Sequence, residues 1–122
     1  MNHGSLEEMQ ERLTAATMVL GEAGEITFRS MFGGVGVYHN GRIFSTLSDV
    51  GLALKFGPTT VAELLKVPEA KLLRYDPSAP ESKSYVVVPL TIQFELDEFS
   101  HWVRKSLDFV ATLPAPKPKK SK

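Results

Sequence analysis

The sequence predicts an α+β domain in which helices pack on an antiparallel sheet. Apolar residues recur at helical spacing near both ends of the chain, and several short β-like segments lie between them. Asn40-Gly41, the strongest hairpin signal in the sequence, separates two of these segments. With 122 residues, 43% of them apolar, the chain can bury one core but is too short for two.

The first element is predicted to be a helix over residues 6–20. Ser5 and Glu8 have the S-x-x-E spacing of a capping box, and Gly21 follows the last apolar position. The apolar face of this helix consists of Leu6, Met9, Leu13, Ala16, Thr17 and Leu20. We interpret residues 1–5 as an expression remnant or a disordered start, and we leave residues 1–4 out of the fold prediction.

An antiparallel meander of three or four strands is predicted to follow. The β-like segments, separated by turn residues, cover residues 26–31, 35–39, 42–47 and 52–56. A two-residue turn at Asn40-Gly41 would pair Tyr38 with Ile43 and Val37 with Phe44.

Side-chain alternation along these strands defines two sheet faces. We expect helices to cover the face formed by Tyr38, Ile43, Ser45, Leu47, Leu52, Leu54 and Phe56. The other face would carry Val35, Val37, Phe44, Thr46, Ala53 and Lys55. Its large apolar side chains are predicted to lie near solvent and to form a protein-contact or self-association surface. The alternative is that the short middle helix and the 76–84 loop cover them.

The second half of the chain predicts a short helix, two strands and a final helix. The short helix spans residues 59–66, and the strands 72–75 and 85–88 flank a polar loop. Asp97 is the predicted cap of the last helix, over residues 98–112, whose apolar stripe includes Trp102 as a core residue. Alternating proline and lysine predict a disordered tail over residues 114–122.

Charge and composition exclude several classes of protein. Fourteen basic residues balance fourteen acidic ones, but Lys117, Lys119, Lys120 and Lys122 lie at the end of the chain. The body therefore has ten basic and fourteen acidic residues, a net charge of −4, which predicts weak or indirect DNA binding. No apolar stretch is long enough for a membrane span, and no secretory signal is visible, so a cytoplasmic protein is expected.

Catalytic and metal-binding patterns are sparse. The chain has no cysteine, and its three histidines lack a partner at metal-ligand spacing. No serine lies in a G-x-S-x-G sequence. We therefore predict no catalytic residues, no metal and no cofactor.

The glycine-rich run over residues 31–38 is the most distinctive local feature. It leads into a strand rather than a helix, so it does not fit a phosphate-binding loop. We interpret Gly33, Gly34 and Gly36, with Asn40 and Gly41, as structural turn and close-packing positions. Arg29, Met31 and Phe32 cluster beside this turn and, with Val35, Val37 and Phe44, are the candidate partner-binding residues.

The order of these segments resembles the TfoX/Sxy N-terminal domain family. The resemblance lies in R-x-M-F-G-G-x-G-x-Y from Arg29 to Tyr38, in Asn40-Gly41-Arg42-Ile43-Phe44 and in Gly51-Leu52-Ala53-Leu54-Lys55. It continues through residues 85–89 and 102–107 and covers residues 6–113.

The resemblance implies a two-layer sandwich of order α-β-β-β-α-β-β-α, like secretion-chaperone-type folds. It also implies a bacterial regulator of natural competence that acts with the cyclic-AMP receptor protein and supplies no catalytic residues. Our first hypothesis is a non-enzymatic regulatory or adaptor domain that contacts a protein of the transcription machinery. The alternative is a small-ligand-binding module with a pocket between the sheet and the helices.

Overall fold

Helix α1, Leu6–Leu20, begins and ends where the sequence predicts. The Ser5 hydroxyl accepts a hydrogen bond from the Glu8 N–H at 3.0 Å, and the Glu8 carboxylate accepts one from the Ser5 N–H at 2.9 Å. Gly21 ends the helix in the left-handed conformation, with φ of 62°. The capping box and the apolar face are both confirmed, since Met9, Leu13 and Ala16 are fully buried.

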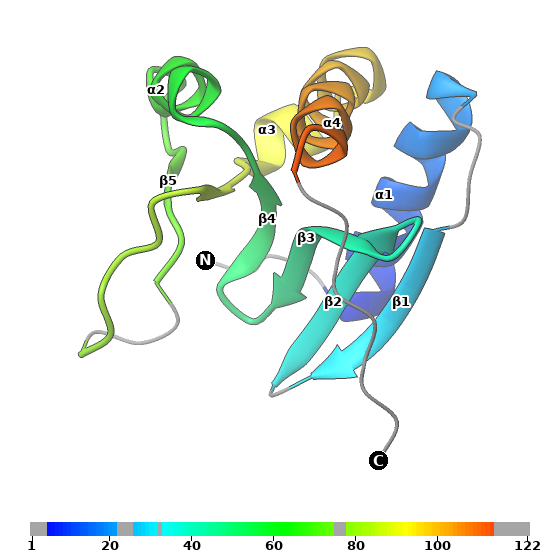
Figure 1. Cartoon of the computed structure of the whole chain (residues 1–122), viewed down its shortest axis with the longest axis horizontal. Helices are drawn as coiled ribbons and strands as arrows, with labels where there is room; N and C mark the ends of the chain where they lie inside the picture. Colours follow the sequence, from blue (N-terminus) through cyan, green and yellow to red (C-terminus); the bar gives the residue numbers. More distant parts are fainter. Residues whose placement is uncertain (1–4, 22–25, 32, 75–77, 114–122) are drawn as a thin grey trace.

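The computed structural model describes residues 5–21, 26–31, 33–74 and 78–113 (Figure 1). Six strands form one antiparallel sheet in the order β1-β2-β3-β4-β6-β5. Their bounds are β1 Ile26–Met31, β2 Gly34–His39, β3 Arg42–Ser48, β4 Gly51–Lys55, β5 Lys71–Leu72 and β6 Tyr85–Val87. The predicted tail over residues 114–122 lies outside the described residues.

Three further helices complete the two-layer fold: α2 Pro58–Leu65, α3 Leu90–Gln93 and α4 Leu96–Ala111. The order implied by the resemblance is matched, apart from a fourth strand before α2 and the short helix α3 before α4. The predicted cap of the last helix is wrong. Gly57 precedes α2 and Glu95 precedes α4, so Asp97 lies within the first turn of α4, where its charge favours the helix N-terminus.

A β-bulge changes the predicted pairing of the central hairpin. Tyr38 pairs with Ile43 as predicted, but Val37 pairs with Ser45 rather than with Phe44. The extra residue on β3 reverses the alternation, so Val37 lies on the same face as Leu47 and Leu54. The expectation that Val37 and Phe44 lie near solvent is therefore wrong, because both are fully buried.

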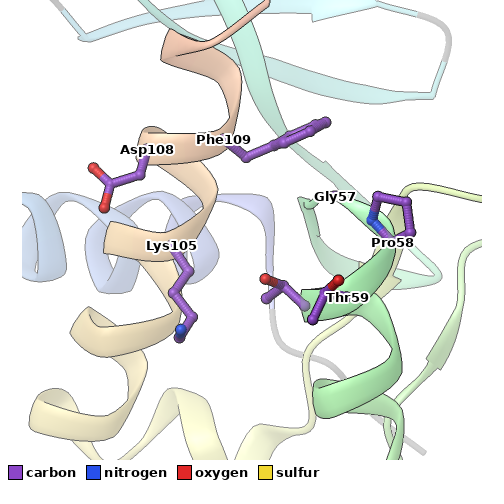
Figure 2. A pocket seen from close by; sticks show the side chains of 7 residues that line it. Gly57, Pro58, Thr59, Lys105, Asp108 and Phe109 are labelled. Carbon is purple, nitrogen blue, oxygen red and sulfur yellow. The ribbon is translucent and has the colours of Figure 1, made fainter.

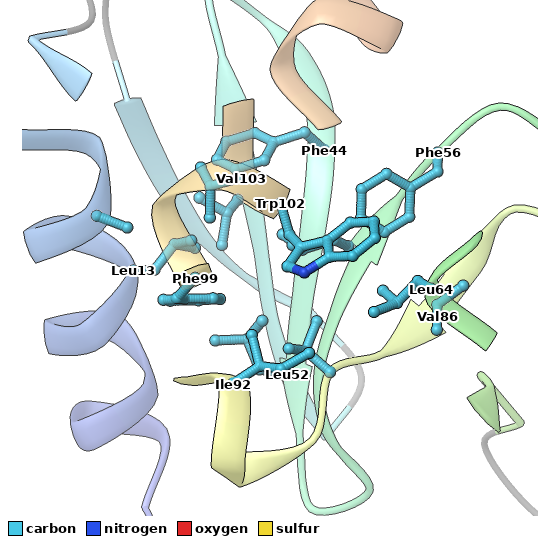
Figure 3. Close-up of a cluster of buried hydrophobic side chains, with 14 of the residues drawn as sticks. Leu13, Phe44, Leu52, Phe56, Leu64, Val86, Ile92, Phe99, Trp102 and Val103 are labelled. Atoms are coloured by element: carbon cyan, nitrogen blue, oxygen red, sulfur yellow. The ribbon is translucent and has the colours of Figure 1, made fainter. Parts of the chain in front are cut away.

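The main core fills the space between the sheet and the helices (Figure 3). It joins the helix-facing side chains of the strands to Leu13, Leu64, Phe99 and Val103. Trp102 belongs to this core, 8% exposed, and its ring packs edge-on against Phe56 with centroids 6.0 Å apart. The predicted core role of Trp102 is confirmed.

A smaller cluster lies on the opposite sheet face. Ala53 and Val87 contact Leu73, which continues the chain beyond β5 and covers that end of the face. The middle helix α2 does not cover this face, since its buried residues Val61 and Leu64 join the main core. None of the helices in the described part of the chain is long and apolar enough to cross a membrane.

Candidate partner-binding surface

The structure disperses the residues predicted to bind a partner. Arg29 is exposed on β1, with its guanidinium 5.4 Å from the centre of the Tyr38 ring. Val35 is half-buried, whereas Val37 and Phe44 are inaccessible in the core. Met31 ends β1, but its side chain and the whole of Phe32 lie outside the described residues. Among the candidate residues whose side chains the structure describes, Arg29 is the exposed one.

The predicted turn residues lie at tight backbone positions. Gly33, Asn40 and Gly41 have positive φ angles of 64°, 51° and 86°. Gly34 lies so close to β3 that an added Cβ would overlap the carbonyl oxygen of Leu47. Gly36 is buried in the sheet beside them. These positions set backbone geometry and present no side chain.

The described residues between the two layers are closely packed. Side chains from both layers meet there with exposed fractions of 0%, among them Phe44, Leu52, Leu54, Phe99 and Val103. The described hollows lie at the surface instead. One of about 420 Å³ lies between the start of α2 and α4, where the Phe109 ring reaches toward Gly57 and where Lys105 and Asp108 line the α4 side (Figure 2).

The turn between α3 and α4 presents the most exposed aromatic side chain of the described residues. Phe94 is 66% exposed and Leu96 is 42% exposed, although both are large and apolar. The guanidinium of Arg12 on α1 lies 5.2 Å from the centre of the Phe94 ring. We call Phe94, Leu96 and Arg12 the α3–α4 corner.

A buried amide fixes this corner to the rest of the fold. Gln93 is 3% exposed, and its amide nitrogen donates to the carbonyl oxygen of Val88 at 2.8 Å. Its amide oxygen accepts from Nε of Arg12 at 2.9 Å. Gln93 thus connects α1 to the end of β6, and it holds Arg12 under the ring of its sequence neighbour Phe94.

The sequence did not single out the corner. Residues 90–96 alternate apolar and polar side chains, a strand-like pattern, yet they belong to no predicted strand and lie outside the predicted stripe of the last helix, and this unassigned pattern is the available signal. Phe94 lies between the polar residues Gln93 and Glu95 and belongs to no predicted apolar face, so the predicted core does not include it. What the sequence could not show is the distant contact with Arg12.

Within the described residues, no group of three histidine, aspartate or glutamate side chains is placed to hold a metal ion.

His101 is exposed on α4 and packs edge-on against the indole of Trp102, with centroids 5.4 Å apart. Lys105 and Asp108 are the charged pair beside the Figure 2 hollow, and Asp108 lies 3.7 Å from Arg104 on its own helix.

Comparison with protein families decides the relationship of this chain. A family model described as the TfoX N-terminal domain matches residues 18–110, well over half of the sequence. The chain belongs to the TfoX N-terminal domain family. Membership supports a competence-related regulatory domain. No curated protein matches the chain.

Proposed function

We propose that this TfoX N-terminal domain is a non-enzymatic cytoplasmic regulator that binds a protein of the transcription machinery through the α3–α4 corner. Family membership supports the regulatory class. The observation that carries the contact surface is Phe94, a large aromatic side chain that is 66% exposed yet held in place by Arg12.

Protein interfaces favour this combination of residues. Aromatic and arginine side chains are enriched among the few positions that supply most of the binding free energy. Binding also costs less when a side chain is already ordered, because fewer rotamers are lost. The stacked Arg12 and the buried Gln93 order the corner before a partner arrives.

Charged residues surround the apolar part of the corner. Leu96 adds apolar area next to Phe94, and Glu95, Asp97 and Glu98 are exposed beside it. An apolar centre with a polar rim is the usual arrangement of a protein interface. The acidic rim favours a partner with basic residues around an apolar pocket.

The test measures binding to the purified cyclic-AMP receptor protein and to RNA polymerase of the same organism. Phe94→Ala should weaken the affinity about tenfold or more, as expected for an aromatic anchor. Leu65→Ala is the matched control, since Leu65 is another exposed apolar residue, 37% exposed, on α2. Both variants should keep the thermal unfolding midpoint of the wild type.

Two results would contradict the proposal. If neither transcription protein binds the wild type, the proposed class of partner is wrong. If one binds and Phe94→Ala binds equally well, the contact surface lies elsewhere on the domain.

A further inference from the structure

Strand β1 forms a free edge of the sheet in the described structure. It stands at one end of the strand order, and its six residues pair with β2 without a register shift. A regular edge strand presents backbone N–H and C=O groups that no neighbouring strand uses. Such an edge can accept a further strand.

In the part of the chain that the structure describes, β1 lacks the usual protections of an edge. The strand contains no proline or lysine, and the pairing irregularity of this sheet lies between β2 and β3. Arg29 is its single charged residue, and its guanidinium stacks over Tyr38 on the sheet face away from α1. The charge therefore does not block the edge on the helix side.

A surface hollow of about 550 Å³ lies beside this edge, between β1 and one flank of α1. Phe28 enters it from β1, and Ala15 and Met18 enter it from α1. Met18 is 75% exposed, so the hollow leaves apolar surface uncovered. Glu7 and Glu11, both exposed, line the hollow one and two turns from the start of the helix.

Helix α1 and strand β1 run in opposite directions (Figure 1), which gives the hollow two different ends. The apolar end, at Met18, lies toward the start of β1, and the acidic end lies toward Met31. Glu7 and Glu11 are four residues apart on one helix flank, so their charges repel each other. A basic side chain placed there would relieve this repulsion.

We propose that β1 binds an extended segment of another protein, which adds a strand to the sheet and carries a lysine or arginine. Its backbone pairs with the free edge of β1. Alternate apolar side chains enter the hollow at Phe28 and Met18, as in other strand-addition complexes. Its basic side chain meets Glu7 and Glu11 at the far end.

A second copy of the chain is a poorer occupant of this site. Pairing β1 with β1 would bring a second α1 flank, lined by Glu7, Gln10, Glu11, Thr14, Ala15 and Met18, to the same side of the sheet. That flank carries two carboxylates and no base, so nothing in it neutralises the first pair. Arg29 cannot serve, because it lies on the opposite face.

This inference goes beyond the proposed function, since it names another surface and another recognition chemistry. The α3–α4 corner and the β1 edge share no residue. A failure of Phe94→Ala to affect binding therefore leaves the β1 site standing, and the reverse also holds.

The experiment titrates an acetylated eight-residue peptide, two lysines followed by alternating threonine and valine, into the isotope-labelled full chain, so that antiparallel pairing with β1 places the lysines at the acidic end. Amide signals of β1 and of the hollow-lining flank of α1 should shift. Glu7→Gln combined with Glu11→Gln should raise the dissociation constant roughly fivefold, as expected for two exposed ion pairs. The matched control, Glu63→Gln with Glu69→Gln, removes the same charge from exposed positions in and after α2 and should bind like the wild type.

Two altered peptides test the two parts of the recognition. Replacing the lysines by glutamates should abolish binding, and methylating alternate backbone nitrogens should do the same. The proposal is overturned if the shifts map away from β1, or if the double glutamine variant binds like the wild type. It is also overturned if sedimentation shows a dimer whose β1 amides are protected without peptide, because a second copy then occupies the edge.

Discussion

A single buried hydroxyl, that of Ser106, connects α4 to the irregular part of the sheet. Its oxygen lies 2.8 Å from the carbonyl oxygen of Lys55 and 3.1 Å from that of Phe44. Since a hydroxyl has one proton, the two carbonyl groups share a single donor. Phe44 is the extra residue of the β-bulge, so this bond serves a backbone group at the point where the ladder is interrupted.

Ser106→Ala should therefore lower the free energy of unfolding by about 1 kcal/mol, because it removes a buried hydroxyl that donates to backbone carbonyl oxygens. The control is Thr112→Ala, which removes an exposed hydroxyl that donates to the carbonyl oxygen of Phe109 at 2.6 Å. That change should cost about 0.5 kcal/mol or less. Urea unfolding of both variants checks the prediction, and equal losses would show that the buried position of Ser106 has no special effect.

At the scale of elements, Gly34 sets how closely β2 approaches β3. A Cβ there would overlap the carbonyl oxygen of Leu47 and come within 3.1 Å of the Cβ of Ser48. The obstacle is backbone in a paired strand, so it cannot move aside as a flexible side chain would. Glycine is required at this position by close approach, and not by an unusual φ angle.

Gly34→Ala should destabilise the protein by about 3 kcal/mol or more, since a clash with backbone is among the severe effects of a single substitution. Its neighbour provides the control. Gly33 has a φ of 64° and open space around it, so Gly33→Ala should cost only the left-handed backbone penalty, about 1–2 kcal/mol. Thermal unfolding of the two variants separates them, and a smaller loss for Gly34→Ala would contradict the close-packing explanation.

The same scale shows how far the sequence predicts the fold. Periodicity and capping residues locate α1, and the Asn40-Gly41 turn fixes the pairing of Tyr38 with Ile43. These signals are local, so the sequence contains them. The bulge at Phe44, directly after Ile43, has no local signal, because it depends on the burial of Phe44 and on a hydroxyl 62 positions away. Because the predicted pairing has no bulge, it places Val37 and Phe44 on the sheet face opposite to the core.

The candidate surface also depends on distant contacts, which local sequence signals do not predict. Exposure of Phe94 depends on α3 ending at the corner and on Arg12 lying 81 residues before Gln93, and neither follows from the neighbouring sequence. Val37 and Phe44, which the sequence predicts to be exposed, are buried in the core by elements far away in the sequence. Arg29 remains exposed because β1 is an edge strand, which the strand order determines.

At the scale of the whole molecule, the layers are arranged asymmetrically. The helices contribute their buried side chains to the core on one side of the sheet, including those of α2, which the alternative prediction placed over the other side. On that other side, the described cover is the short segment around Leu73. The strand order of this open sheet leaves β1 at one edge.

Charge is the other property of the whole molecule, and it sets the affinity for DNA. Apart from four lysines among the last six residues, the chain carries a net charge of −4, so the lysines must supply any attraction to phosphates. We expect the full chain to bind duplex DNA weakly and without sequence preference at about 0.15 M salt, with a dissociation constant above about 1 µM, as for non-specific binding. At most four phosphate contacts predict roughly a hundredfold loss of affinity between about 50 and 200 mM salt.

Fluorescence anisotropy measures the dissociation constant and its salt dependence for the wild type and for a variant in which Lys117, Lys119, Lys120 and Lys122 are all changed to glutamine. The glutamine variant should show no binding, because its acidic body repels the duplex. Sub-micromolar binding by that variant would place a DNA site on the folded body and would contradict the role assigned to the charge.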